Sequence, residues 1–233
     1  MFFPYKDDNP LKHGPPWITL SIIGLCAVIY LFLQLPLGNN ESRAFVIGYG
    51  FIPVLLFGDL TLPIDLAQIP TSFTLITCMF LHGGIMHLLG NMWFLWVFGD
   101  NVEDAMGPSR FILFYLLSGL VASAAQIATD TNSIIPMVGA SGAIGGVMGA
   151  YALLYPRARV RTLVFLGFFI TTLSVPAFFI LAWWFVVQLV SGLPTLGRQG
   201  GGVAFWAHIG GFLAGILLVT LFRQRPSRTI GGT

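Results

Sequence analysis

The chain has 233 residues, of which 56% are hydrophobic and only 9% are charged. Soluble domains carry about 25% charged residues, so this composition excludes an ordinary soluble protein and predicts one embedded in a membrane. The net charge of +2, without any basic run, excludes nucleic acid as a partner and leaves membrane lipids.

Six apolar segments are interpreted as membrane spans. They are residues 17–35, 82–98, 110–127, 139–155, 176–190 and 203–222. The first is too long for a cleavable signal and is expected to be retained. Residues 160–172 are apolar but broken at Gly167, so the fifth span is placed after them.

The predicted fold class is all-α, a polytopic bundle of six transmembrane helices that forms one domain over residues 1–233. Residues 1–15 and 223–233 are expected as polar cytoplasmic tails. Residues 36–70 are too interrupted to cross a bilayer and too apolar to leave it. We therefore expect them to form an outer loop with short amphipathic helices in the membrane interface.

The basic residues predict the orientation of the chain. With the N-terminus inside, nine of the eleven lysines and arginines fall in inner segments, and only Arg43 and Arg198 fall in outer loops. This is a positive-inside pattern. We expect an integral protein of a bacterial inner (plasma) membrane, with both termini cytoplasmic. The halves show no inverted repeat, which weakens the case for a transporter.

Three of the predicted spans carry polar residues near the outer face, where each of them enters the membrane. Ser141 lies ~5 Å into its span, His87 ~8 Å and His208 ~9 Å. Polar side chains inside a membrane are costly and face the bundle interior or a water-filled cavity. Their common depth predicts a functional site in one shallow layer.

The residue types in this layer suit acyl transfer. Ser141 is a candidate nucleophile and His208 a candidate general base, while small residues on both spans would allow close approach. All nine acidic residues fall outside the predicted spans, so the pair would be a dyad without a carboxylate. His87 and Asn91 are four apart on one helical face, and both can donate to an oxyanion.

The sequence also allows purely structural roles for these candidate site residues. The glycines around Ser141 are typical of helix packing, and His208 or Asn91 alone could form an ordinary interhelical hydrogen bond. His82 is interpreted as structural, and His13 is assigned no role. A histidine relay in a transporter would need a polar path through the inner half of the membrane, which the spans lack. No metal or cofactor is expected, because the histidines have no carboxylate partner.

Three motifs in order resemble the rhomboid family of intramembrane serine proteases. They are G-A-S-G at residues 139–142, A-H-I-G-G at residues 207–211, and H-x4-H-x3-N at His82, His87 and Asn91. The resemblance covers three of the six spans. It implies that Ser141 is the nucleophile, His208 the base, and His87 with Asn91 the oxyanion donors. It also implies that the substrates are transmembrane segments of other proteins, cut near their outer ends. A non-catalytic relative that only binds membrane proteins is the main alternative.

The sequence departs from the family pattern at two places. Some members have an aromatic residue four positions after the nucleophile, where this chain has Gly145, and many have a tryptophan-arginine pair that is missing from residues 36–70. Independently of the family, the glycine-rich residues 192–202 are hypothesised to act as a mobile cap over the site. The sequence leaves the oligomeric state open.

Overall fold

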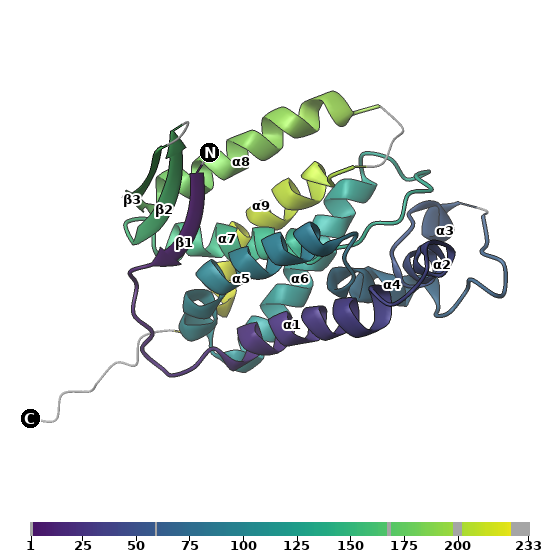
Figure 1. Cartoon of the computed structure of the whole chain (residues 1–233), viewed down its shortest axis with the longest axis horizontal. Helices are drawn as coiled ribbons and strands as arrows, with labels where there is room; N and C mark the ends of the chain where they lie inside the picture. Colours follow the sequence, from purple (N-terminus) through teal and green to yellow (C-terminus); the bar gives the residue numbers. More distant parts are fainter. Residues whose placement is uncertain (1, 59, 167–168, 198–201, 225–233) are drawn as a thin grey trace, which may run out of the picture.

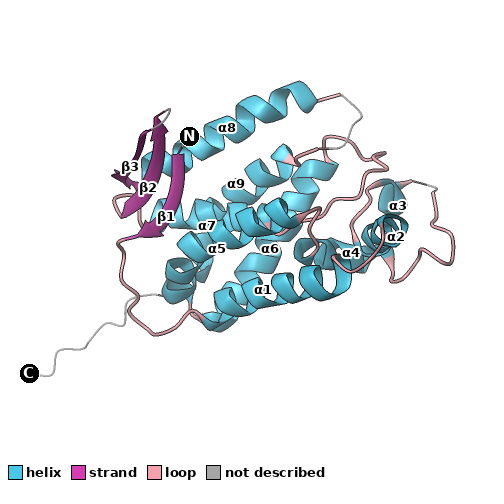
Figure 2. Ribbon diagram, in the orientation of Figure 1, coloured by secondary structure: helices cyan, strands magenta, loops and turns pink. Residues whose placement is uncertain are grey.

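The computed structural model describes residues 2–58, 60–166, 169–197 and 202–224. Within these residues the chain is mostly helical, with one small sheet beside the helices (Figure 2). The helical fold class predicted from the sequence is therefore confirmed. The long helices are α1 (Trp17–Val28), α5 (Ile85–Met106), α6 (Pro108–Ile127), α7 (Ser141–Leu154), α8 (Ala177–Gly192) and α9 (Phe205–Phe222).

Shorter helical segments connect or extend the long ones. They are the π-helix η1 (Ile29–Gln34), the helices α2 (Asn39–Tyr49), α3 (Val54–Phe57) and α4 (Thr71–Thr77), and the 3-10 helices η2 (Cys78–Phe80) and η3 (Leu193–Thr195). Two of these, α2 and α3, lie in the segment 36–70, where short helices are expected. Their position in the membrane interface stays a prediction.

Four helical segments are long and apolar enough to cross a membrane: Trp17–Gln34, Pro108–Ile127, Ala177–Thr195 and Phe205–Phe222. The segment Thr71–Phe80 together with α5 would add a fifth span, bent by 78°. Helix α7 has 14 residues, about 21 Å of helix, which is shorter than the ~30 Å hydrocarbon layer. Helix length and composition thus support four or five spans, and the sixth crossing, by residues 139–155, stays a prediction.

Helix α7 lies at the centre of the bundle, in contact with α5, α6, α8 and α9 (Figure 1). Glycines let the backbones of α7 and α9 touch. A Cβ atom added at Gly211 would lie 1.9 Å from the carbonyl oxygen of Gly142, and one added at Gly215 would lie 1.9 Å from that of Gly146. Because contacting residue numbers rise together along both helices, α7 and α9 are parallel and start at the same end of the bundle.

A three-stranded antiparallel sheet stands beside the helices, in the order β1 (Phe2–Asp7), β2 (Arg159–Leu166), β3 (Phe169–Pro176). The expectation of a polar tail is therefore wrong for residues 2–7, which pair with β2. Asp7 of β1 is buried and accepts a hydrogen bond from the hydroxyl of Tyr151 on α7, at 2.5 Å. Burial raises the pKa of the Asp7 carboxyl, and this hydrogen bond opposes the rise.

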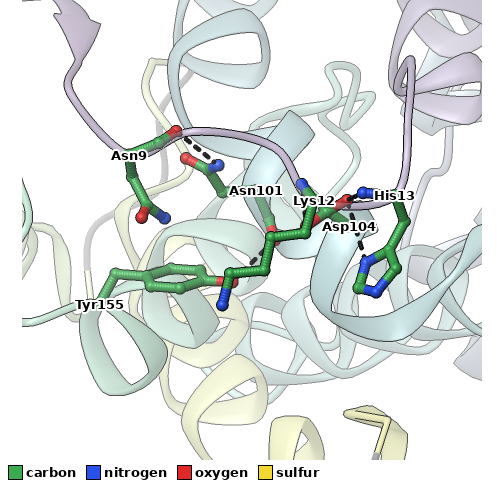
Figure 3. A network of polar contacts seen from close by, with 6 residues as sticks. All are labelled: Asn9, Lys12, His13, Asn101, Asp104 and Tyr155. Atoms are coloured by element: carbon green, nitrogen blue, oxygen red, sulfur yellow. Dashed lines mark hydrogen bonds and ion pairs between the residues drawn. The ribbon is translucent and has the colours of Figure 1, made fainter.

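Acidic residues near the end of α5 hold the chain that follows β1, and Figure 3 shows one of them, Asp104. Asp104 accepts hydrogen bonds from the backbone N–H groups of Lys12, at 3.1 Å, and His13, at 2.7 Å. Glu103 accepts two more from the first turn of α1, at 2.9 and 2.7 Å, where a negative charge is favourable. The N-terminal segment is thus attached to the bundle, and the His13 ring also pairs with Asp104.

Candidate active site

Ser141 is the first residue of α7, and the loop before it is fixed by backbone hydrogen bonds. Gly139 donates to the carbonyl oxygen of Cys78, at 2.8 Å, and Met137 exchanges two bonds with Phe51. Gly139 has a φ of +126°, a conformation that favours glycine. The backbone N–H of Ser141 lies in the first turn of α7, where N–H groups have no partner within the helix. Ser141 is half-buried, so its N–H and hydroxyl are held at a defined helix start.

His208 lies in the first turn of α9, next to the first turn of α7. A Cβ atom added at Gly142 would lie 3.8 Å from the carbonyl oxygen of Ala207, and one added at Gly145 would lie 2.9 Å from that of His208. Ser141 and His208 therefore sit at the same end of two adjacent helices. Their side chains share no hydrogen bond within the described part of the chain, and in free enzymes such contacts often tighten only when substrate binds. Direct contact between them stays a prediction.

The imidazole of His208 is held from α8. Its Nδ1 atom lies 2.7 Å from Oε1 of Gln188, and its ring centroid is 5.8 Å from the ring centroid of Trp184. A side chain at Gly145 could not take the place of Trp184, because the backbone of α9 already fills that space. The sequence reasoning missed both α8 residues.

His87 and Asn91 lie one turn apart on α5 and reach the loop before Ser141. A Cβ atom added at Gly139 would lie 2.7 Å from Nε2 of His87 and 3.5 Å from Nδ2 of Asn91. The backbone N–H of Gly83 donates to Nδ1 of His87, at 3.2 Å, so the neutral ring carries its hydrogen on Nε2. The Asn91 amide nitrogen is buried and has no partner among the described residues. Two N–H donors therefore face this loop.

His82 is buried, with 1% of its surface exposed. Its backbone N–H and carbonyl groups both bond to the side chain of Gln34, each at 3.0 Å. These bonds tie the end of η1 to the approach to α5 and support the structural role predicted for His82. No group of three or more His, Cys, Asp or Glu side chains in the described ranges could hold a metal ion.

A cavity lies beside Ser141, between α6, α7 and the start of α9. Its lining consists mainly of small residues, among them Gly119, Ala122, Ser123 and Ala207. The cavity leaves free space next to the candidate nucleophile. The hypothesised cap, residues 192–202, is described only in part, since residues 198–201 lie outside the described ranges.

Comparisons with known proteins point to one family. Residues 70–225 match the family model described as the rhomboid domain. The chain is 32% identical to "Rhomboid protease GluP" of Bacillus subtilis over 205 residues, 88% of this chain and 34% of that protein. It is 31% identical to "Putative rhomboid protease YdcA" of Bacillus subtilis over 135 residues, 58% and 60% of the two chains.

A third similar protein, "Rhomboid protein 1, mitochondrial" of Saccharomyces cerevisiae, is 28% identical over 229 residues, 88% of this chain and 63% of that protein. The chain spans between 34% and 63% of the length of these three relatives. The matched region includes α5, α7 and α9, which carry the four candidate site residues.

Proposed function

The chain belongs to the rhomboid family, and on this premise we propose that it is an intramembrane serine endopeptidase. Its substrates would be transmembrane segments of other membrane proteins, cut near their outer ends. The observation that carries the proposal is the convergence on residues 139–142. His87 and Asn91 approach Gly139 on one side, while α9 brings His208 alongside the first turn of α7.

In the first half of the reaction, the Ser141 hydroxyl attacks the carbonyl carbon of the scissile peptide bond, and its proton passes to Nε2 of His208. Negative charge develops on the carbonyl oxygen. The Ser141 backbone N–H, Nε2–H of His87 and the Asn91 amide stabilise that charge. The tetrahedral intermediate collapses when the C–N bond breaks, and His208 gives the proton to the leaving amine.

In the second half, water replaces the amine. His208 takes a proton from the water as its oxygen attacks the acyl carbon, and the same donors stabilise the second oxyanion. Breaking the ester bond returns the proton to Ser141 and releases the new carboxyl end. No carboxylate is required, so the dyad relies on neutral side chains to hold the imidazole.

The family and the apolar helices establish the protein as integral to a membrane. We propose further that it lies in a bacterial inner membrane with both termini cytoplasmic and the dyad toward the outer face, although one similar protein is mitochondrial. The positive-inside pattern of the described loops supports this orientation.

The decisive experiment is labelling with a serine-directed phosphonate or isocoumarin probe, with the modified residue located by mass spectrometry. We expect modification at Ser141 that depends on His208, because the serine needs its base. Cleavage of a reporter with a helix-destabilised transmembrane segment should be abolished in Ser141→Ala and in His208→Ala, with thermal unfolding unchanged.

The matched control is Ser21→Ala, which changes an exposed serine of α1 far along the chain from the site. It should cleave at the parental rate. The proposal is falsified if Ser141→Ala or His208→Ala also cleaves at that rate. Binding of membrane proteins without cleavage or labelling would instead identify a non-catalytic relative.

A further inference from the structure

Gln188 is a buried amide in a helix whose only other polar residue, apart from the tryptophan N–H groups, is Ser191 near its end. Helix α8 has the sequence A-F-F-I-L-A-W-W-F-V-V-Q-L-V-S-G, and 8% of the surface of Gln188 is exposed. A buried amide needs a partner to offset its lost contact with water. Its partner is the imidazole of His208, whose Nδ1 atom lies 2.7 Å from the amide oxygen Oε1.

With the amide oxygen Oε1 facing the ring, this contact indicates one tautomer of the neutral imidazole. A carbonyl oxygen can only accept a hydrogen bond, so the hydrogen of the neutral imidazole must be on Nδ1. The lone pair is then on Nε2, the ring nitrogen that points away from Gln188. That is the form a general base requires, because only an unprotonated nitrogen can take the proton of a serine hydroxyl.

A second residue of α8 holds the plane of the same ring. Trp184 lies one helical turn before Gln188, so both side chains share one face of α8. The rings of Trp184 and His208 are inclined by 33°. Trp184 also packs on Phe212, with ring centroids 6.0 Å apart. The aromatic contact thus comes from α8, since α7 has only Gly145 at the nearest position.

We propose that Gln188 is a positioning residue that holds His208 in the Nδ1–H tautomer and aims Nε2 toward Ser141, with Trp184 fixing the ring plane. The proposal rests on the proposed protease function. Gln188 orients the histidine as the aspartate of a Ser-His-Asp triad does, but it carries no charge. The dyad then depends on the docking of α8 against α9.

The tautomer can be measured without any turnover. The chain has four histidines, so nuclear magnetic resonance of protein labelled with nitrogen-15 histidine can be assigned by single His→Gln variants. We expect the neutral His208 ring to be protonated at Nδ1 in the parental protein and to lose this preference in Gln188→Met. Protonation of His208 at Nε2 in the parental protein would overturn the proposal, whether or not the protein is a protease.

Kinetics test the consequence for catalysis. Gln188→Met keeps the size of the side chain but removes the acceptor. We expect kcat to fall roughly 10- to 100-fold with little change in KM, by analogy with metal-bound histidines that lose their hydrogen-bond partner. Gln188→Glu keeps the acceptor and should restore most of the rate. A carboxylate there also stabilises the protonated ring, so the acidic limb of the pH–rate profile should move to higher pH.

His87, the other titratable group near His208, is the same in every variant, so differences between the profiles report on residue 188. A merely structural amide would predict loss of stability in both variants, with kcat of the folded protein and the His208 tautomer unchanged in Gln188→Met, and that result would contradict the proposal. So would a Gln188→Met variant with parental kcat and profile. If Gln188→Met fails to fold, the Gln188→Glu profile and the parental tautomer decide the question.

Two adjacent tryptophans supply a matched pair for the ring contact. Trp184 faces His208, whereas Trp183 is 59% exposed. We expect Trp184→Ala to lower kcat and Trp183→Ala to leave it unchanged. Equal rates in these two variants would remove Trp184 from the proposal.

Discussion

At the scale of single residues, the candidate oxyanion donors make the sharpest prediction. His87→Ala and Asn91→Ala should each lower kcat about 10- to 1000-fold, by analogy with the loss of about 100- to 1000-fold when one oxyanion donor is removed, with KM little changed. The reporter cleavage assay measures both constants. His13→Ala is the control, because His13 pairs with Asp104 outside the candidate site. If both donor variants turned over as fast as the parental protein, the oxyanion role would be lost.

Burying a polar side chain in an apolar span is costly, and some of these residues reveal a candidate site by their sequence positions alone, whereas others do not. Ser141, His87 and His208 are polar residues at matching depths in separate apolar segments, so their positions alone indicate a site. Gln188 is equally costly, but it stands alone in its helix, and its partner lies 20 positions away on another helix. Only the packing of α8 on α9 connects the two. The polarity of Gln188 within an apolar span was the available signal.

At the scale of elements, the contact between α7 and α9 predicts the effect of adding one methyl group. Gly211→Ala would place a Cβ atom 1.9 Å from the carbonyl oxygen of Gly142, so the helices must separate, at a cost of about 1–3 kcal/mol. We expect a lower Tm and weaker labelling at Ser141. The matched control is Gly24→Ala on α1, where a Cβ atom meets nothing within 4 Å. An unchanged Tm for Gly211→Ala would mean that the helix contact is not tight.

The sheet is the element that sequence reasoning missed. In β2, Val160, Thr162 and Val164 are buried, whereas Arg159 and Arg161 are exposed. This alternation has the period of a strand. Its first partner, β1, lies more than 150 positions earlier in the chain, and no local pattern connects the two. The helices were predictable because each one's apolar length is a local property.

At the scale of the whole molecule, the helices α5, α7 and α9 all begin at the same end of the bundle, and the order of the predicted spans explains why. Spans two, four and six must enter a membrane from the same side if every span crosses. Helices α7 and α9 are parallel, and the first turns of α5 meet the start of α7 at Gly139. Ser141, His208 and His87 therefore lie toward one end of the bundle, and their joint role in catalysis stays a prediction. Which side of a membrane that end faces is a separate question.

Labelling with a membrane-impermeant maleimide shows which side of the membrane this end of the bundle faces. Single-cysteine labelling suits this chain because its own cysteines, Cys26 and Cys78, are buried with 0% and 4% exposure. In intact bacterial cells we expect labelling of Asp65→Cys, in the segment 36–70, and of Thr195→Cys, at the end of η3; both residues are exposed and are predicted to lie outside. Arg157→Cys, exposed just after α7, should react only once the membrane is permeabilised.

The Arg157→Cys variant also tests whether the short helix α7 crosses the membrane. If residues 139–155 did not cross, Arg157 would stay on the same side as the loop before Ser141, and its cysteine would react in intact cells. Such labelling would contradict the sixth crossing and the positive-inside orientation together, because Arg157, Arg159 and Arg161 would then lie outside. Protection of Arg157→Cys in intact cells, with labelling of the other two, requires an odd number of crossings between Asp65 and Arg157, and α5, α6 and α7 supply three.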